Sequence, residues 1–398
     1  MILGILRSDH EELQELLGKL LVAARLQEGL RQAICESMDQ GTPEAFLRML
    51  KVVEEHDLIR FSSVKRAVSA WIGIFNENSV DRVNEKLLRL MGQCLRDDAC
   101  CKDQLAANDG VAVNTALWAL GFREAGDAIR AMGELVDHGT KNQKLSASYY
   151  NRCLYDKDLE LQTSRKVVLE HAEDLELVTA FMPGFSFSIR NWIQESFEEQ
   201  SLYAVKLGTP KTPELTRYYR DRQEAEALYT AFQSVCDRLP KKGISFHPFI
   251  FPWYDAELHP SELLIQTAYL AWLLQDEEKI TAMAGRLGEI KDEYLRVNLL
   301  NLLLYEPSGR EQRRQIIGYM GNTHTRTSQM AVEIVKKLRL EQEEYGLLED
   351  MLRFKREGLR GILIGLLMEQ PEERMPECLR RLLSDKTEEK RSAGLDML

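Results

Sequence analysis

The sequence predicts an all-α protein built as an α-solenoid, in which antiparallel helical hairpins stack side by side in two lobes. Three observations predict this architecture. Helix-forming residues dominate the composition, and the 398 residues include only 11 prolines and 24 glycines. Apolar residues recur at helical spacing over stretches of about 12 to 18 residues, separated by short polar breaks. Four arginines near the C-terminus recur at intervals of 30, 34 and 31 residues, which is typical of a helical repeat.

Several helix starts can be assigned in order along the chain. Ser8 and Glu11 form a capping box ahead of an apolar stripe. Thr42 and Thr212 are each followed by proline and glutamate, which supplies a capping hydroxyl, a proline at the first helical position and an acid in the first turn. A further start is expected at Ser261 and Glu262, after Pro260. Because short breaks join these helices, we expect consecutive helices to be antiparallel.

One predicted helix, over Val111–Phe122, is apolar on nearly every side. It carries Ala112, Ala116, Ala119 and Gly121, which allow neighbouring backbones to approach closely. We therefore expect this helix to be buried between its neighbours. Its apolar run is well short of the roughly 20 residues needed to span a bilayer, so no transmembrane segment is predicted.

The pattern divides the chain into three parts. Residues 1–240 are expected to form an N-terminal lobe of helical hairpins, and residues 261–398 a C-terminal repeat array. Residues 241–260 contain three prolines and five aromatic residues, which favours a connection between the lobes. The last residues end within the second helix of a repeat, so we expect a longer native chain with a further C-terminal domain.

The segment Leu379–Leu398 resembles a HEAT repeat, of the HEAT/armadillo class of helical repeats. Two leucines close one helix, Asp385 opens the turn, and Arg391 follows six residues later. The resemblance covers roughly residues 287–398 and implies that Asp385 and Arg391 tie neighbouring hairpins together. A tetratricopeptide-like array is the competing interpretation, particularly for Ala147–Glu173.

The other three repeat arginines depart from the HEAT pattern. Six residues before Arg296, Arg326 and Arg360, the chain has isoleucine, methionine and phenylalanine, none of which can pair with an arginine through its side chain. All four arginines could line a groove that binds carboxylates or phosphates. The alternative that we favour is structural, with each arginine bracing a neighbouring turn or helix end.

A second resemblance concerns Leu145–Pro183. This segment is similar to the helical region of large uncharacterised bacterial proteins that carry a C-terminal domain linked by name to molybdate regulation. The resemblance implies a bacterial protein in which more chain normally follows.

The aromatic connection provides the candidate partner contacts, Phe249, Trp253 and Tyr254. Tryptophan and tyrosine are favoured interface anchors, so these rings could hold a partner helix or peptide. They could instead pack onto the solenoid and fill the junction between the lobes. His247 and His259 flank the connection, but their spacing matches no zinc motif, so no metal is expected.

No local signature of catalysis or cofactor binding is present, including phosphate-binding, dinucleotide-binding and nucleophile-elbow motifs. No cofactor is therefore expected. The seven cysteines have no regular framework and are expected to be free thiols. Cys100 and Cys101 are adjacent and Cys94 precedes them, but vicinal thiols in helices are more often packing residues than redox centres.

The net charge of −11 disfavours nonspecific binding to nucleic acid or anionic lipid. Residues 1–200 carry a net −9 and residues 201–398 a net −2, so the two halves could meet different partners. Basic runs beginning at Arg310, Lys336 and Arg353 are interleaved with glutamates, which favours ordinary solvated faces. The apolar N-terminal stretch is too short for a signal peptide, and we expect a cytoplasmic location.

These observations predict a non-catalytic scaffold that binds a protein partner, because repeats offer a large rigid surface without special chemistry. Two alternatives remain open. One is a nucleic-acid-binding or base-processing protein built on HEAT-like repeats, which would need a continuous basic groove. The other is the regulatory arm of an enzyme whose active site lies beyond Leu398.

Overall fold

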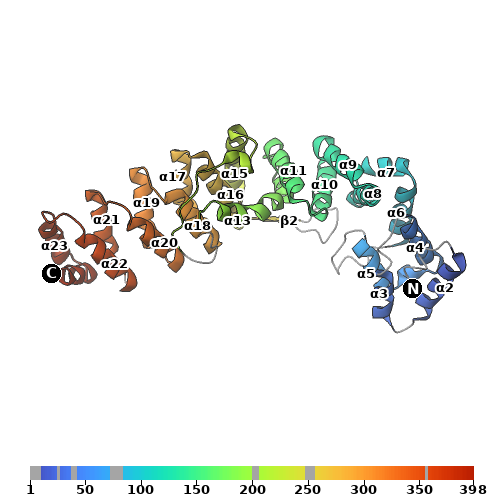
Figure 1. Cartoon of the computed structure of the whole chain (residues 1–398), viewed down its shortest axis with the longest axis horizontal. Helices are drawn as coiled ribbons and strands as arrows, with labels where there is room; N and C mark the ends of the chain where they lie inside the picture. The colour runs from blue at the N-terminus through green and yellow to red at the C-terminus, as the bar shows by residue number, and fades with distance from the viewer. Residues whose placement is uncertain are drawn as a thin grey trace. The chain divides into compact units, whose positions relative to one another are not determined.

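The computed structural model describes the chain at residues 10–24, 27–36, 43–71, 84–199, 206–246, 256–354 and 357–398. Most of these residues lie in helices, and the prediction of an all-α protein is confirmed. The described residues form two compact units: Met1–Gly184 with Ile244–Leu258, and Phe185–Gly243 with His259–Leu398 (Figure 1). No described helix is long and apolar enough to cross a membrane.

The first unit consists of short helices and one small β-ladder. Its helices are α2 (Glu11–Ala23), α3 (Glu28–Glu36), α4 (Pro43–Glu55), η1 (Leu58–Arg60), α5 (Ser62–Trp71), α6 (Glu85–Arg96), α7 (Asp98–Leu105), α8 (Gly110–Arg123), α9 (Ala125–His138), α10 (Lys141–Cys153), α11 (Lys157–Glu170) and α12 (Leu175–Phe181).

Contacts between next-but-one helices run through the first unit. In one row, α2, α4, α6, α8, α10 and α12 each contact the next member, while α3 contacts α5 and α9 contacts α11. Several helices, such as α8 and α10, therefore pack both on a sequence neighbour and on the corresponding helix of the adjacent pair. Aspartates begin many of these helices: the carboxylate of Asp109, for example, accepts hydrogen bonds from the backbone N–H of Val111 and Ala112 at the start of α8.

The helix α8 is buried between its neighbours, as the sequence predicts. It contacts α6, α7, α9 and α10, and Ala116, Leu117 and Ala119 are completely buried. Gly121 provides close approach to α10, because a Cβ atom at this position would lie 2.2 Å from the hydroxyl of Tyr150.

Two predicted helix starts lie just outside the described residues, and a third is not followed by the predicted helix. Ser8 and Thr42 lie outside the described residues, while α2 begins at Glu11 and α4 at Pro43. No helix follows Thr212 directly, because residues up to 214 are irregular and a helix of four residues begins only at Leu215. Favourable capping residues do not by themselves stabilise a helix that has no apolar face to bury.

The aromatic connection contains the strands that the sequence analysis did not predict. Strand β1 (Ile244–Phe246) pairs antiparallel with β2 (Ala256–Leu258), with Ser245 opposite Glu257. The ladder belongs to the first unit, where β2 contacts α12 and Phe246 packs against a buried cluster that includes Phe181. A ladder of three residues per strand leaves the all-α classification unchanged.

The second unit consists of α13 (Pro183–Glu195), α14 (Leu215–Tyr218), α15 (Arg222–Arg238), α16 (Pro260–Leu274), α17 (Glu277–Arg286), η3 (Leu287–Glu289), α18 (Glu293–Leu304), α19 (Arg310–Met320), α20 (Thr325–Val335), α21 (Gln342–Met351), α22 (Glu357–Met368), α23 (Met375–Ser384) and α24 (Glu388–Asp396).

Two rows of helices make up the larger part of the second unit (Figure 1). In the row that we call the even row, α16 contacts α18, α18 contacts α20, and α22 contacts α24. In the odd row, α17 contacts α19 and α19 contacts α21. Sequence neighbours also pack together, as in α19 with α20 and α23 with α24. Buried apolar residues from both rows, such as Leu299 and Leu300 of α18 and Ile316 of α19, form the core.

The observed units divide the chain differently from the expected boundary at residue 240. Helices α13 to α15 belong with the C-terminal helices because α15 packs along α16, and because Arg190 of α13 forms an ion pair of 2.7 Å with Asp292. The hydroxyl of Ser196 also lies 3.1 Å from that of Tyr269 in α16. Sequence composition located the aromatic connection, whereas packing between distant residues decides which helices belong to each compact unit.

Candidate functional site

The repeat arginines lie near the start of successive even-row helices. Arg296 in α18 is buried, with 2% of its surface exposed. Its Nε donates a hydrogen bond of 3.0 Å to the hydroxyl of Thr327 in α20, and its Nη1 donates one of 2.9 Å to the main-chain oxygen of Ile290. One side chain therefore joins the turn before its own helix to the next helix of the row.

Arg391 in α24 makes the corresponding bond to its own turn. Its Nη1 donates to the main-chain oxygens of Asp385 and Lys386, both at 2.9 Å. The Asp385 carboxylate instead accepts from the N–H and hydroxyl of Thr387, each at 2.8 Å, and these bonds lower the pKa of Asp385. Arg296 and Arg391 thus each donate to the main-chain carbonyl of the residue six positions earlier. Any residue type supplies such a carbonyl.

Arg360 and Arg326 reach neighbouring even-row helices in different ways. Arg360 in α22 donates a hydrogen bond of 2.9 Å to the hydroxyl of Ser392 and forms an ion pair with Asp396, and both partners lie in α24. The guanidinium of Arg326 in α20 lies 4.4 Å from the ring centroid of Tyr294 in α18. All four side chains therefore have partners within the array.

The odd-row helices are joined by ion pairs at the same sequence spacing. Arg313 of α19 binds Glu344 of α21 through Nε at 2.5 Å and Nη2 at 2.7 Å. Arg381 of α23 binds Glu349 of α21 in the same two-pronged manner, at 3.1 and 2.7 Å. Burial alone would raise the pKa of Glu344, but the hydrogen bonds from Arg313 and from the backbone of Glu341 hold it below its usual value.

The predicted aromatic contacts, Phe249, Trp253 and Tyr254, lie outside the described residues, as does His247. Among the residues that the structure describes, no group of three or more His, Cys, Asp or Glu side chains could hold a metal ion. The six cysteines whose side chains are described are free thiols.

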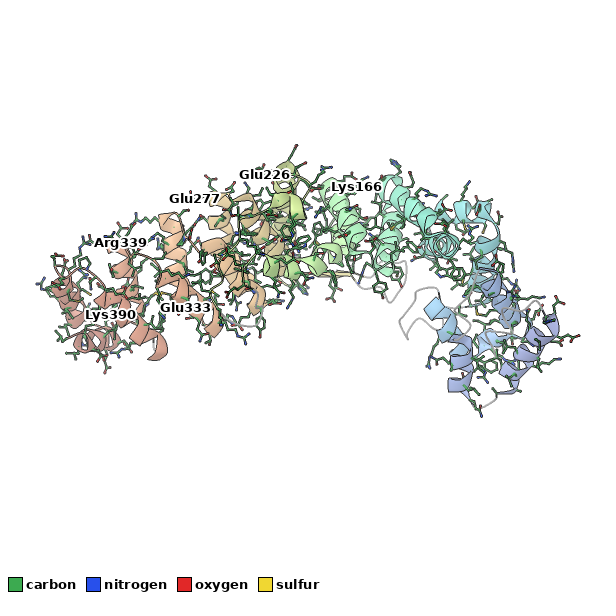
Figure 2. The ribbon with its side chains drawn as sticks, viewed as in Figure 1. Lys166, Glu226, Glu277, Glu333, Arg339 and Lys390 are labelled. Carbon is green, nitrogen blue, oxygen red and sulfur yellow. The ribbon has the colours of Figure 1, made fainter. Side chains whose placement is uncertain are left out.

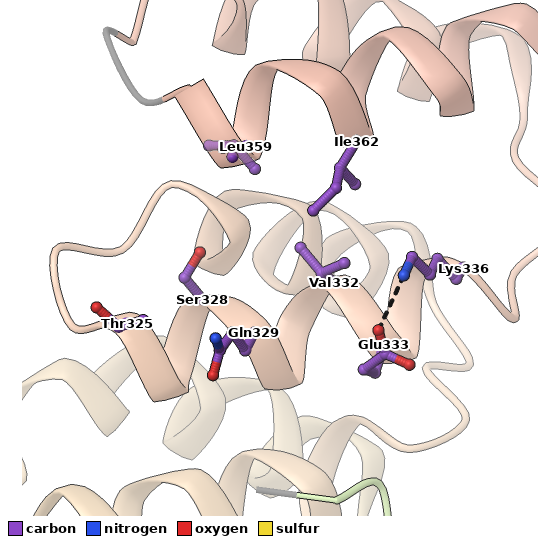
Figure 3. Close-up of a pocket in the computed structure, with 9 residues that line it drawn as sticks. Thr325, Ser328, Gln329, Val332, Glu333, Lys336, Leu359 and Ile362 are labelled. Carbon is purple, nitrogen blue, oxygen red and sulfur yellow. Dashed lines mark hydrogen bonds and ion pairs between the residues drawn. The ribbon is translucent and has the colours of Figure 1, made fainter.

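A groove that the sequence analysis did not identify separates α20 from α22 (Figure 3). It has a volume of about 430 Å³, which lies within the range of ligand-binding clefts. Its lining residues are Thr325, Ser328, Gln329, Val332, Glu333 and Lys336 from α20, and Gly358, Leu359 and Ile362 from α22.

The floor of this groove is apolar and its edges are polar. Val332 and Leu359 are buried and face each other across the gap with Ile362, whereas Gln329 is exposed at the edge (Figure 3). Glu333 and Lys336 are exposed and form an ion pair of 2.9 Å. Charged side chains of both signs, including Glu277, Glu333, Arg339 and Lys390, lie on the surface of this unit (Figure 2).

Gly358 lines the groove and adds no side chain to its wall. A Cβ atom at Gly358 would meet no other atom within 4 Å. The signal in the sequence was the three glycines of EGLRGILIG, at positions 358, 361 and 365. A glycine in a helix costs about 1 kcal/mol relative to alanine, so three in one short helix are unfavourable unless they serve a purpose.

The groove is open, whereas the four repeat arginines are engaged with neighbouring helices or with their own turn. A comparison with curated proteins finds no match to the chain. A family model described as a family of unknown function, DUF5724, matches residues 1–398. The chain therefore belongs to the DUF5724 family.

Proposed function

We propose that this chain is a non-catalytic interaction scaffold, an α-solenoid of HEAT-like hairpins that binds a partner polypeptide in the groove between α20 and α22. The observation that carries the proposal is this apolar-floored groove within an otherwise closely bridged array. The contacts between next-but-one helices in both units support the solenoid, because each hairpin then buries its apolar stripe against its neighbours.

Bonds at repeat spacing support the same architecture. Arg296 to Thr327, Arg313 to Glu344 and Arg381 to Glu349 each join residues 31 or 32 positions apart. Such bonds hold successive pairs in register, so a gap between two pairs keeps its shape without a ligand. A preformed groove binds at lower entropic cost than one that must open.

The chemistry of the groove favours a polypeptide as its occupant. Val332, Leu359 and Ile362 can bury an apolar side chain, while the amide of Gln329 can bond to the main chain that carries it. A nucleic acid fits less well, because the charged groups at the edge are one glutamate and one lysine that neutralise each other. The arginines of the basic runs that pair with glutamates, such as Arg310 with Glu343, also reduce any positive field.

The test uses a random peptide library displayed on phage and selected against the full chain. We expect enriched peptides with an apolar anchor, and we expect Gly358→Leu to lower their affinity by about tenfold or more, equivalent to roughly 1.4 kcal/mol. The leucine would fill the groove without a clash, since the position has open space.

Gly346→Leu in α21 is the matched control, because a Cβ atom there also meets nothing within 4 Å and the residue does not line the groove. Equal losses in both variants, or no enriched peptide, would contradict the proposal. Salt-dependent binding of single-stranded DNA that Gly358→Leu abolishes would instead support the nucleic-acid alternative.

A further inference from the structure

The strongest unexplained cluster in the molecule is a group of three thiols where α6 meets α7. Cys94 lies in the last turn of α6, and Cys100 and Cys101 lie in the first turn of α7. Asp97 is both the C-cap of α6 and the N-cap of α7. Its carboxylate accepts a hydrogen bond of 2.8 Å from the N–H of Ala99. The chain turns at this residue, so α7 begins directly after α6 ends and its thiols lie close to that end.

The distances within this cluster are short. The Sγ atoms of Cys94 and Cys100 lie 3.5 Å apart. The thiol of Cys101 donates a hydrogen bond of 3.1 Å to the main-chain oxygen of Cys94, and this bond joins α7 to α6. Arg123, at the end of α8, places Nη2 3.5 Å from the Cys101 sulfur and forms an ion pair with Asp98.

We propose that Cys94 and Cys100 are a peroxide-sensitive dithiol that closes to an intramolecular disulfide. A disulfide needs sulfur atoms at about 2.05 Å, so the two Sγ atoms have to approach by roughly 1.5 Å. The inference concerns a modification site and is independent of the groove between α20 and α22.

Exposure sets the order of the two steps. Cys94 and Cys101 are buried, with 0% and 1% of their surfaces exposed, whereas Cys100 is half-buried. A hydroperoxide therefore meets Cys100 first: its sulfur attacks the O–O bond, becomes a sulfenic acid and releases the alcohol, or water from hydrogen peroxide. The sulfur of Cys94 then attacks the sulfenic sulfur and expels hydroxide.

The reaction balances without a further reagent. Two thiols and one hydroperoxide give one disulfide, one alcohol and one water, so the thiols lose two electrons and the O–O bond gains them. The hydroxide that leaves Cys100 is protonated to water as Cys94 loses its proton. The hydrogen bond with Cys101 and burial raise the pKa of Cys94, so Cys94 attacks as its proton passes to the leaving hydroxide and not as a preformed thiolate.

Other cysteines provide the internal comparison. Burial raises the pKa of Cys153 and of Cys236, which makes a thiolate at either position less available. Neither has another described cysteine sulfur among its hydrogen-bond partners. These two thiols should therefore oxidise more slowly than Cys100 and form no internal disulfide.

The test treats the reduced full-length chain with dilute hydrogen peroxide, alkylates the remaining thiols and maps tryptic peptides without reductant. Cleavage after Arg96 separates Cys94 from Cys100, so the disulfide appears as two linked peptides, and fragmentation distinguishes Cys100 from Cys101. We expect a Cys94–Cys100 link that dithiothreitol reverses, while Cys153 and Cys236 remain alkylated.

Variants separate the steps. Cys94→Ser should abolish the link and let the sulfenic acid of Cys100 accumulate, which dimedone labels, and Cys153→Ser should change nothing. Should Cys94→Ser lose its helical circular dichroism, Cys100→Ser, at the less buried position, provides the second test by leaving Cys94 unlinked. A link between Cys94 and Cys101, a link between molecules, or oxidation of Cys100 no faster than that of Cys153 would overturn the proposal.

Discussion

The two compact units repeat the same contact pattern but join their helices by different chemistry. In the second unit, the bond from Arg296 to Thr327 is buried, and the pair of Arg313 with Glu344 is largely so. In the first unit, the equivalent ion pairs, such as Lys141 with Asp174 and Arg89 with Glu54, are partly or largely exposed. The difference lies in the exposure of these ion pairs, since the first unit also has buried polar bonds, such as that from the buried Arg31 to the main-chain oxygen of Leu21 at 2.9 Å.

Apolar packing in the first unit centres on α8. Its fully buried Leu117 belongs to a cluster with Val113, Met132 and Phe181, while Ala116 and Ala119 belong to a second cluster around Phe46. One helix therefore contributes to two apolar clusters among the described residues of this unit. We expect the first unit to be most sensitive at α8, and the second at its buried arginine.

The largest effect should come from Leu117→Ala. Removing a completely buried leucine leaves a cavity and should cost about 2–5 kcal/mol of unfolding free energy. In a stack, the loss of hydrogen-exchange protection should be greatest in α6 to α10 and decline toward α2 and α12. Mass-spectrometric hydrogen exchange measures this gradient, and a uniform loss across the first unit would argue for a single globular core.

Arg296→Met should follow, at about 2–3 kcal/mol, because it leaves the Thr327 hydroxyl and the Ile290 carbonyl without their buried donor. Urea unfolding of this variant, of Thr327→Val and of the double variant gives the coupling energy of the pair. A stabilising effect of Arg296→Met, as occurs when some buried ions are replaced by apolar residues, would remove the contrast between the units.

Glu344→Gln should lower the free energy of unfolding by about 1–2 kcal/mol near neutral pH, and the size of this loss should depend on pH. Because the folded-state pKa of Glu344 is lowered, its carboxylate stabilises the fold above the unfolded pKa of about 4.3, and that contribution is lost as the pH falls through the folded value. The difference between wild type and variant should therefore shrink in acid. Denaturant unfolding from pH 7 to pH 3 tests this, and a constant difference would show that the Arg313 pair does not set the pKa.

The smallest effect should be that of Arg391→Met, at about 0.5 kcal/mol, because this arginine is exposed and water can replace it at the two carbonyls. Comparing it with Arg296→Met isolates burial, since both arginines bond to a carbonyl six residues earlier. Equal costs in thermal unfolding would mean that the bond itself, and not its burial, determines the contribution.

Local features of the fold were predictable from residues close in sequence. The apolar pattern of Val111–Phe122 predicted a buried helix, and α8 is one. The intervals between the arginines predicted positions that recur, and Arg296 and Arg391 do share a bond to their own turn. The acceptor was not predictable from residue identity, because a main-chain carbonyl is present whichever side chain stands there.

The candidate sites required contacts between distant residues. The groove exists because α20 and α22 pack less closely than α18 and α20, which no single helix reveals. The thiol cluster spans only eight residues, yet helix propensity alone does not show that α6 ends and α7 begins at Asp97, which brings Cys100 close to Cys94.

The sequence by itself determined that this protein is helical and that Val111–Phe122 forms a buried helix, because helix propensity and apolar periodicity act over a few residues. Only the tertiary structure decided which helices form one compact unit, which arginine is buried, where two helices separate and which thiols meet. Those outcomes depend on how helices pack against one another, whether the residues in contact are 31 positions apart, as Arg296 and Thr327 are, or six, as Cys94 and Cys100 are. The pattern of a single helix does not give the distance to its neighbour.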